Sequence, residues 1–200
     1  SGAGRVVERD VYIGYDLPRA PQNIKLVDNF DGTALLSWDS PGTKGVNDGY
    51  VDENELTYNV FSVQGESVST FRTGVTERSL DITDIPQTGE QSLFYFLLKA
   101  SSSVGESKIG RSPWIIAGSP YTLPFHEGFP DGNIENSFWT RGKDGKNNIE
   151  IVNGTSSDND GGCLKFLADK SGESASISSG KIDLAQANNP TLLFSYYAVP

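Results

Sequence analysis

Few side chains in this 200-residue sequence could carry out covalent or acid–base catalysis. His126 is the only histidine and Cys163 the only cysteine, so a Ser-His or Cys-His mechanism would have to use His126. The sequence contains no Gly-x-Ser-x-Gly motif, and no pair among its 26 acidic residues stands out as the acid and base of a glycosidase. The simpler roles are a packing or exposed histidine and a small buried cysteine in a strand. We therefore predict a protein that is not an enzyme.

A structural calcium site is the most specific chemistry that the polar residues suggest. Glu127 and the pair Asp158 and Asp160, in the run SSDNDGG, offer carboxylate oxygens on segments that loops between strands could bring together. The spacing is not that of an EF-hand, because Cys163 would stand where that motif needs glycine. The alternative is that these Asp, Asn and Gly residues form ordinary turns.

A second acidic segment, Gly42–Glu55, has the same two interpretations. It carries four carboxylates, at Asp48, Asp52, Glu53 and Glu55, and could hold a cation or could be a solvated turn. The EF-hand spacing fails here too, because Glu53 takes the position of the required glycine when Asp48 is counted first.

Aromatic side chains are the remaining candidates for a binding surface. We predict ligand contacts at Trp114 and Tyr50, either to a protein or by stacking on a glycan. Trp114 is also expected to pack where two modules join. Trp38 and Trp139 are expected in hydrophobic cores. Further candidates for a sugar-stacking surface are Trp139, Tyr196 and Tyr197.

The charge of the chain argues against two classes of partner. Sixteen Lys and Arg residues stand against 26 Asp and Glu residues, a formal net charge of −10, and no basic cluster interrupts the acidic surface. A polyanion would be repelled, so we expect no nucleic-acid partner. The sequence contains no apolar run of membrane-spanning length, so we expect no membrane insertion.

Strands, and not helices, must position these residues. Apolar residues recur at every second position from Phe94 to Ala100 and from Ala34 to Trp38, the period of a half-buried strand. Frequent Gly, Pro, Ser and Asn residues mark turns between short segments. The predicted strands of the first half lie near 23–27, 33–38, 56–64, 67–72, 79–83, 93–101 and 108–117. This pattern predicts an all-β protein that begins with a Greek-key sandwich.

The first half of the chain resembles a fibronectin type III domain. The landmarks occur in the order of that family: Pro18 and Pro21, Trp38, Tyr58 and Val60, Leu80, Ile82, Ile85 and Pro86, the alternating run from Phe94 to Ala100, and Gly105 with Ser107. One landmark differs, because Phe94 stands where the family usually carries a tyrosine whose hydroxyl closes a corner. That corner hydrogen bond is expected to be absent or replaced.

The second half resembles the opening part of a jelly-roll module of the cleaved-adhesin, MAM-like or choice-of-anchor kind. The resemblance lies in residues 123–129 (LPFHEGF), in Trp139, in residues 178–184 (SSGKIDL) and in residues 190–196 (PTLLFSY). It implies a structural calcium that joins an acidic residue of the opening motif to a loop, and an origin in Bacteroidetes, where such modules follow type III modules in surface or secreted proteins. The sequence provides fewer strands than a jelly roll needs, which predicts an incomplete second sandwich and an open apolar strand at Leu192–Tyr197.

These observations predict the following organisation. Residues 1–17 are expected to be an extended lead-in from an upstream module, residues 18–118 a type III domain, and residues 119–200 the first part of a jelly roll. We expect a non-catalytic bacterial protein, extracellular or on the cell surface, that serves adhesion, protein or glycan binding, or spacing between modules. The alternative is an accessory region of a secreted protease or glycosidase whose catalytic domain lies elsewhere.

Overall fold

The computed structural model describes residues 12–130, 137–141, 149–153, 162–167 and 176–196. The proposed ligands Asp158 and Asp160, as well as Tyr197, therefore lie outside the described residues. The chain divides into two compact units, one of Ser1–Gln87 with Ser92–Ala117 and the other of Thr88–Gln91 with Gly118–Pro200. The regular elements of the described residues are β-strands and one single-turn 3-10 helix, η1 (Glu53–Glu55), which confirms the all-β prediction. None of them contains a helix long and apolar enough to cross a bilayer.

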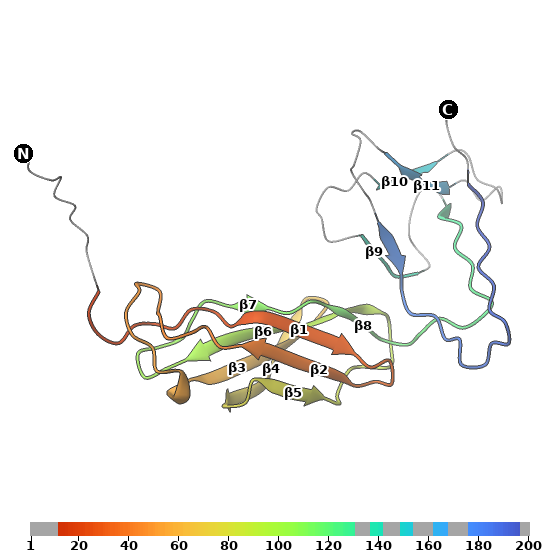
Figure 1. Ribbon diagram of the computed structural model, residues 1–200. Helices are drawn as coiled ribbons and strands as arrows, with labels where there is room; N and C mark the ends of the chain where they lie inside the picture. The colour runs from red at the N-terminus through yellow and green to blue at the C-terminus, as the bar shows by residue number, and fades with distance from the viewer. Residues whose placement is uncertain (1–11, 131–136, 142–148, 154–161, 168–175, 197–200) are drawn as a thin grey trace, which may run out of the picture. The chain divides into compact units, whose positions relative to one another are not determined.

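The first unit is a sandwich of two antiparallel sheets (Figure 1). One sheet has the order β1-β2-β5, made of β1 (Gln22–Asp28), β2 (Ala34–Asp39) and β5 (Ser79–Ile82). The other has the order β4-β3-β6-β7, made of β4 (Ser67–Val75), β3 (Thr57–Gln64), β6 (Ser92–Ser101) and β7 (Gly110–Arg111), and β8 (Ile115–Ala117) also pairs with β6. This is an Fn3-like β-sandwich, as the resemblance implied, and it occupies about half of the chain.

The last predicted strand is broken in two. Ser112, Pro113 and Trp114 separate β7 from β8, where the sequence predicted one strand over 108–117. Pro113 has no N–H for the ladder. The Ser112 hydroxyl takes over part of the pairing, because it accepts a hydrogen bond from the backbone N–H of Phe96 at 2.9 Å and donates to the carbonyl of Pro113 at 2.6 Å.

The core of the sandwich follows the predicted alternation. Phe94, Phe96, Leu98 and Ala100 on β6 are each no more than 4% exposed, and the predicted core residue Trp38 is 3% exposed. The Phe94 ring packs edge-on against Phe96, with 5.3 Å between the ring centroids. An apolar ring contact therefore occupies the position where the family usually has a tyrosine.

The described residues of the second unit form two short antiparallel strand pairs. β10 (Ile149–Asn153) pairs with β11 (Gly162–Phe166), and β9 (Trp139–Arg141) pairs with β12 (Ile177–Ser179). The apolar run predicted as a strand is extended coil over residues 191–196, where Leu192, Leu193 and Phe194 are at least 76% exposed. A strand is defined by its hydrogen-bonded neighbour, and no described strand of this unit pairs with this run.

Candidate functional site

The described part of the lead-in, residues 12–17, lies along the loop that joins β2 to η1. The backbone N–H of Asp16 donates to the carbonyl of Tyr50 at 2.9 Å, and the N–H of Tyr50 donates to the carbonyl of Gly14 at 2.8 Å. The N–H of Val46 donates to the carbonyl of Leu17 at 3.0 Å. This segment is therefore paired with the first unit before β1 begins.

The Asp16 carboxylate fixes this arrangement. Oδ2 accepts hydrogen bonds from the backbone N–H groups of Asn47 (2.5 Å) and Gly49 (3.2 Å). Oδ1 accepts from the N–H of Leu17 (2.8 Å) and from the side-chain amide of Asn47 (3.0 Å). Asp16 is only 3% exposed. Burial raises the pKa of Asp16, but the hydrogen bonds from Asn47, Leu17 and Gly49 outweigh it and hold the pKa below its ordinary value.

Two glycines of the loop leave room for this carboxylate. A Cβ atom on Gly45 would come within 2.5 Å of the Asp16 Cβ. A Cβ on Gly49 would come within 2.8 Å of the same atom and would also strike the ring of Tyr12. Real Cβ contacts are not this short, so the close approach of lead-in and loop requires glycine at both positions.

The pairing places two tyrosines side by side on the surface. Tyr15 and Tyr50 lie opposite each other in a parallel bridge, and their ring centroids are 5.5 Å apart with an interplanar angle of 58°. Tyr15 is 60% exposed and Tyr50 50% exposed. Tyr12 donates a hydrogen bond from its hydroxyl to the carbonyl of Tyr15 at 3.1 Å and is itself 48% exposed. We call Tyr12, Tyr15 and Tyr50 the tyrosine cluster.

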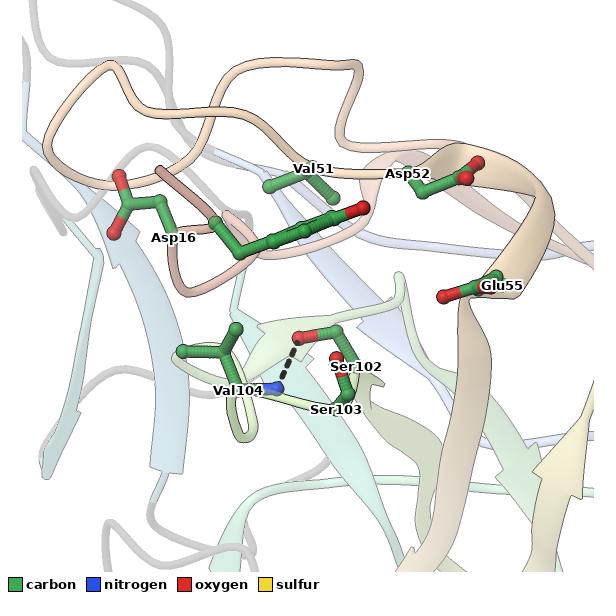
Figure 2. A pocket seen from close by; sticks show the side chains of 8 residues that line it. Asp16, Val51, Asp52, Glu55, Ser102, Ser103 and Val104 are labelled. Atoms are coloured by element: carbon green, nitrogen blue, oxygen red, sulfur yellow. Dashed lines mark hydrogen bonds between the residues drawn. The ribbon is translucent and has the colours of Figure 1, made fainter. Parts of the chain in front are cut away.

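Carboxylates lie beside the tyrosine cluster. Asp52 and Glu55 stand on one side of a small hollow, with Ser102, Ser103 and Val104 below (Figure 2). The hollow measures about 10 Å³, enough for about one water molecule, so a larger ligand must lie over it. The charge of Asp52, then burial, then Tyr15 and Glu55 raise the pKa of the Tyr50 hydroxyl above its ordinary value of 10.0.

Carboxylates of the acidic loop take part in a helix cap and an ion pair. Asp52 caps η1 by accepting a hydrogen bond from the N–H of Asn54 at 3.0 Å. Asp48 forms an exposed ion pair with Arg19 at 2.8 Å. No group of three or more His, Cys, Asp or Glu side chains converges anywhere among the described residues. Asp48 and Asp52 thus each have a partner within the first unit.

Trp114 and Tyr50, the two predicted ligand contacts, lie near opposite ends of β6. Trp114 is half-buried and precedes Ile115, which pairs with Phe94 near the start of β6. The hollow lined by Tyr15, the ring neighbour of Tyr50, includes Ser102, which directly follows the end of β6. The two residues therefore belong to different surfaces of the first unit.

Glu127, the predicted calcium ligand of the second unit, accepts hydrogen bonds with both oxygens. Oε1 accepts from the N–H of Phe129 at 3.0 Å. Oε2 accepts from the hydroxyl of Ser137 and from the indole N–H of Trp139, the latter at 3.2 Å. Oε1 accepts one hydrogen bond from the described residues, which leaves a lone pair that a cation could approach.

Tyr15 and Asp16 are residues of the candidate site that the sequence alone does not single out. Their partners stand more than 30 positions later, as the separation of 31 between Asp16 and Asn47 shows. The run Asn47-Asp48-Gly49 is a recognisable turn signal, but nothing in it indicates which carboxylate the turn encloses.

Comparisons with known proteins identify fold similarity only. No protein-family model and no curated protein sequence matches the chain. Among solved structures, an Fn3-like protein from Clostridium thermocellum shares 24% identity and has a TM-score of 0.34, covering 52% of this chain and 96% of that one. The FN5 domain of Drosophila Lar shares 16% identity at a TM-score of 0.34, covering 52% and 98%. A structure of titin kinase and its flanking domains shares 19% identity at a TM-score of 0.39, and the chain covers 18% of its length.

The strand order of the first unit defines its class independently of these similarities. It is an Fn3-like β-sandwich of two antiparallel sheets.

Proposed function

We propose that this chain is a non-catalytic extracellular binding module of a larger bacterial surface or secreted protein, and that it contacts a protein partner through the tyrosine cluster. The observation that carries the proposal is the exposed pair Tyr15 and Tyr50, held in place by the buried carboxylate of Asp16. Tyrosine is enriched in protein interfaces because its ring supplies contact area and its hydroxyl supplies a hydrogen bond. A surface fixed before binding also loses little conformational entropy when a partner arrives.

The ring geometry supports a protein partner over a glycan. A pyranose ring stacks best on a flat aromatic face, whereas the rings of Tyr15 and Tyr50 are inclined by 58° to each other. Inclined rings form a notch that suits a side chain. The carboxylates of Asp52 and Glu55 beside the notch would complement a Lys or Arg side chain of the partner.

The second unit is proposed to be the opening part of a jelly-roll module with a calcium ion bound by Glu127, Asp158 and Asp160. The lone pair left on Glu127 Oε1 is compatible with this role. The rival proposal, an accessory region of a secreted hydrolase, differs in its neighbours. Reading the coding sequence on both sides of the chain distinguishes the two, because only the rival requires a catalytic domain in the same polypeptide.

The binding proposal is tested with the immobilised chain on arrays of secreted and cell-surface proteins and, separately, on glycan arrays. We expect protein signals that Tyr50→Ala weakens at least about tenfold, the loss of about 1.4 kcal/mol expected for a central interface tyrosine. Tyr196→Ala is the matched control, because Tyr196 is 85% exposed in the second unit and should leave binding unchanged.

Two results would overturn the proposal. Signals confined to the glycan array would replace the protein partner by a sugar. Protein signals that Tyr50→Ala leaves intact would place the contact surface elsewhere on the chain.

A further inference from the structure

One aromatic side chain of the first unit is almost fully exposed and stands on a strained backbone. Phe30 lies in the loop between β1 and β2 and is 89% exposed. Its φ angle is +61°, in the left-handed region that residues with a bulky side chain rarely adopt. Phe30 is not part of the buried core of the described residues, so neither the exposed ring nor the strained backbone serves the packing of this unit.

Hydrogen bonds within the loop hold Phe30 in this conformation. Oδ1 of Asp28 accepts from the backbone N–H of Phe30 at 2.8 Å. Oδ1 of Asp31 accepts from the N–H of Thr33 at 2.9 Å and from the Thr33 hydroxyl at 2.6 Å. The N–H of Asn29 donates to the carbonyl of Thr33 at 3.0 Å and closes the loop. The ring is thus presented by a loop that needs little ordering when a partner arrives.

Two further apolar side chains are exposed on the same hairpin. Val27 and Leu35 lie opposite each other in the ladder of β1 and β2, so their side chains share one face of the sheet. They are 52% and 40% exposed, which identifies this face as the outer one. Val27 precedes Phe30 by three positions in the chain. We call Val27, Phe30 and Leu35 the hairpin patch.

Carboxylates border the hairpin patch. Asp28 ends β1 and Asp31 belongs to the loop, while Asp81 of β5 pairs with Leu35 and shares its face of the sheet. The hydrogen bonds from Thr33 hold the pKa of Asp31 below its ordinary value, so this carboxylate is charged at neutral pH. The patch is therefore apolar at its centre and acidic at its rim, the usual arrangement of apolar and polar groups in a protein interface.

The acidic rim selects among the possible occupants of the patch. A bilayer that contains anionic lipids would repel both the rim and a chain of net charge −10. A two-fold contact between copies of the chain would bring the rim against itself. The nearest base on β1, Lys25, pairs with Ser37 further from the loop than Val27 and does not interrupt the rim. A protein whose apolar pocket is edged by Lys or Arg side chains would both receive the ring and neutralise the rim.

We propose that the hairpin patch is a second interaction surface of the first unit, with Phe30 as the anchor that enters an apolar, basic-rimmed pocket of a protein partner. The lead-in with Tyr12 and Tyr15 precedes the start of β1, whereas the loop with Phe30 follows its end (Figure 1). A seven-residue strand is about 20 Å long, so the tyrosine cluster and the hairpin patch are separate surfaces. The proposal is independent of the partner bound by the tyrosine cluster.

Thermal unfolding of the full chain tests whether Phe30 serves a partner or the fold. Asparagine tolerates the left-handed region, so Phe30→Asn should raise the melting temperature of the first unit by a few degrees. Leu35→Asn is the matched control, because Leu35 is an exposed apolar residue of the same hairpin without a positive φ. It should leave the melting temperature unchanged or lower it. A Phe30→Asn variant that melts below the wild type would show that the ring supports the fold, and this result overturns the proposal.

Binding is tested with the immobilised full chain on arrays of secreted and cell-surface proteins. We expect signals that Phe30→Asn weakens at least about tenfold, that Tyr50→Ala leaves intact and that added salt reduces, because the acidic rim contributes to them. Signals that fall only with Tyr50→Ala would support the tyrosine cluster and overturn the hairpin patch.

Two further measurements separate the protein partner from the other occupants. Flotation with phosphatidylcholine vesicles that Phe30→Asn abolishes would assign the ring to a lipid surface. Sedimentation that shows a dimer in the wild type and a monomer in Phe30→Asn would assign it to a second copy. Either result, or an array without any signal that depends on Phe30, rejects the proposal.

Discussion

Asp16 accepts hydrogen bonds from both the backbone N–H and the side-chain amide of Asn47, which lies 31 residues later in the chain. One carboxylate thus joins the lead-in to the loop before η1, and the exposed pair Tyr15 and Tyr50 depends on that joint. The residues that carry the proposed binding surface are consequently held by a residue that is itself buried.

Replacement of Asp16 should loosen the lead-in in a pH-dependent way. The pKa of Asp16 is lower in the folded chain than its ordinary value of 3.8, so the carboxylate stabilises the fold above that pH. This contribution is lost as the pH falls through the folded pKa. We expect Asp16→Asn to lower the melting temperature by several degrees at pH 7. The gap between wild type and variant should narrow below pH 3.8, and a gap that stays constant with pH would contradict the role of the charge.

A methyl group at Gly49 should displace the lead-in. The added Cβ would strike Tyr12 and approach the Asp16 Cβ within 2.8 Å. We expect Gly49→Ala to increase proteolysis within residues 12–17 and to lower the melting temperature. The control is the same substitution in a chain that lacks residues 1–16, where the atoms it would strike are gone. An equal effect in the shortened chain would show that the clash with the lead-in is not the cause.

The packed core of the first unit predicts a large effect at one leucine and a small effect at its neighbour. Leu36 on β2 is fully buried, whereas Leu35 is 40% exposed. Leu36→Ala should lower the free energy of unfolding by about 2–5 kcal/mol, and Leu35→Ala by less than about 0.5 kcal/mol, in urea denaturation. Similar values for the two variants would contradict the alternation of β2.

Calcium should stabilise the second unit if Glu127, Asp158 and Asp160 share an ion. We expect a chelator to lower the melting midpoint of that unit, and Glu127→Gln to reduce the difference between chelated and calcium-loaded protein. The fluorescence of Trp139, whose indole N–H donates to Glu127, provides a local readout of the same change. A midpoint that the chelator leaves unchanged removes the calcium site.

The sandwich of the first unit could be predicted because strand burial has a period that local sequence displays. The alternation from Phe94 to Ala100 and from Ala34 to Trp38 placed β6 and β2 to within a residue or two, and both runs are buried as expected. The break between β7 and β8 could also have been anticipated, since Pro113 cannot donate to a ladder.

The candidate site could be predicted only in part. Tyr50 is among the aromatic residues that the sequence predicts as ligand contacts, whereas its neighbour Tyr15 is not. Their pairing depends on one carboxylate meeting backbone N–H groups from a distant loop, and backbone donors are the same for every residue type except proline. A hydrogen bond of this kind leaves no periodic pattern in the sequence from which it could be predicted. The apolar run at Leu192–Phe194 shows that a strand-like sequence pattern can also predict too much. Such a pattern does not form a strand unless a neighbouring strand pairs with it.

The hydrogen bonds that the Asp16 carboxylate accepts also determine how the first unit would respond to mechanical load. Tension applied at the N-terminal side passes through the lead-in before it reaches β1, and its path crosses the bond from Tyr50 to the carbonyl of Gly14 and then the bonds from Asn47 and Gly49 to Asp16. Their rupture would separate Tyr15 from Tyr50 while the sandwich stays folded. Stretching would therefore separate the two tyrosine rings before it unfolded the sandwich.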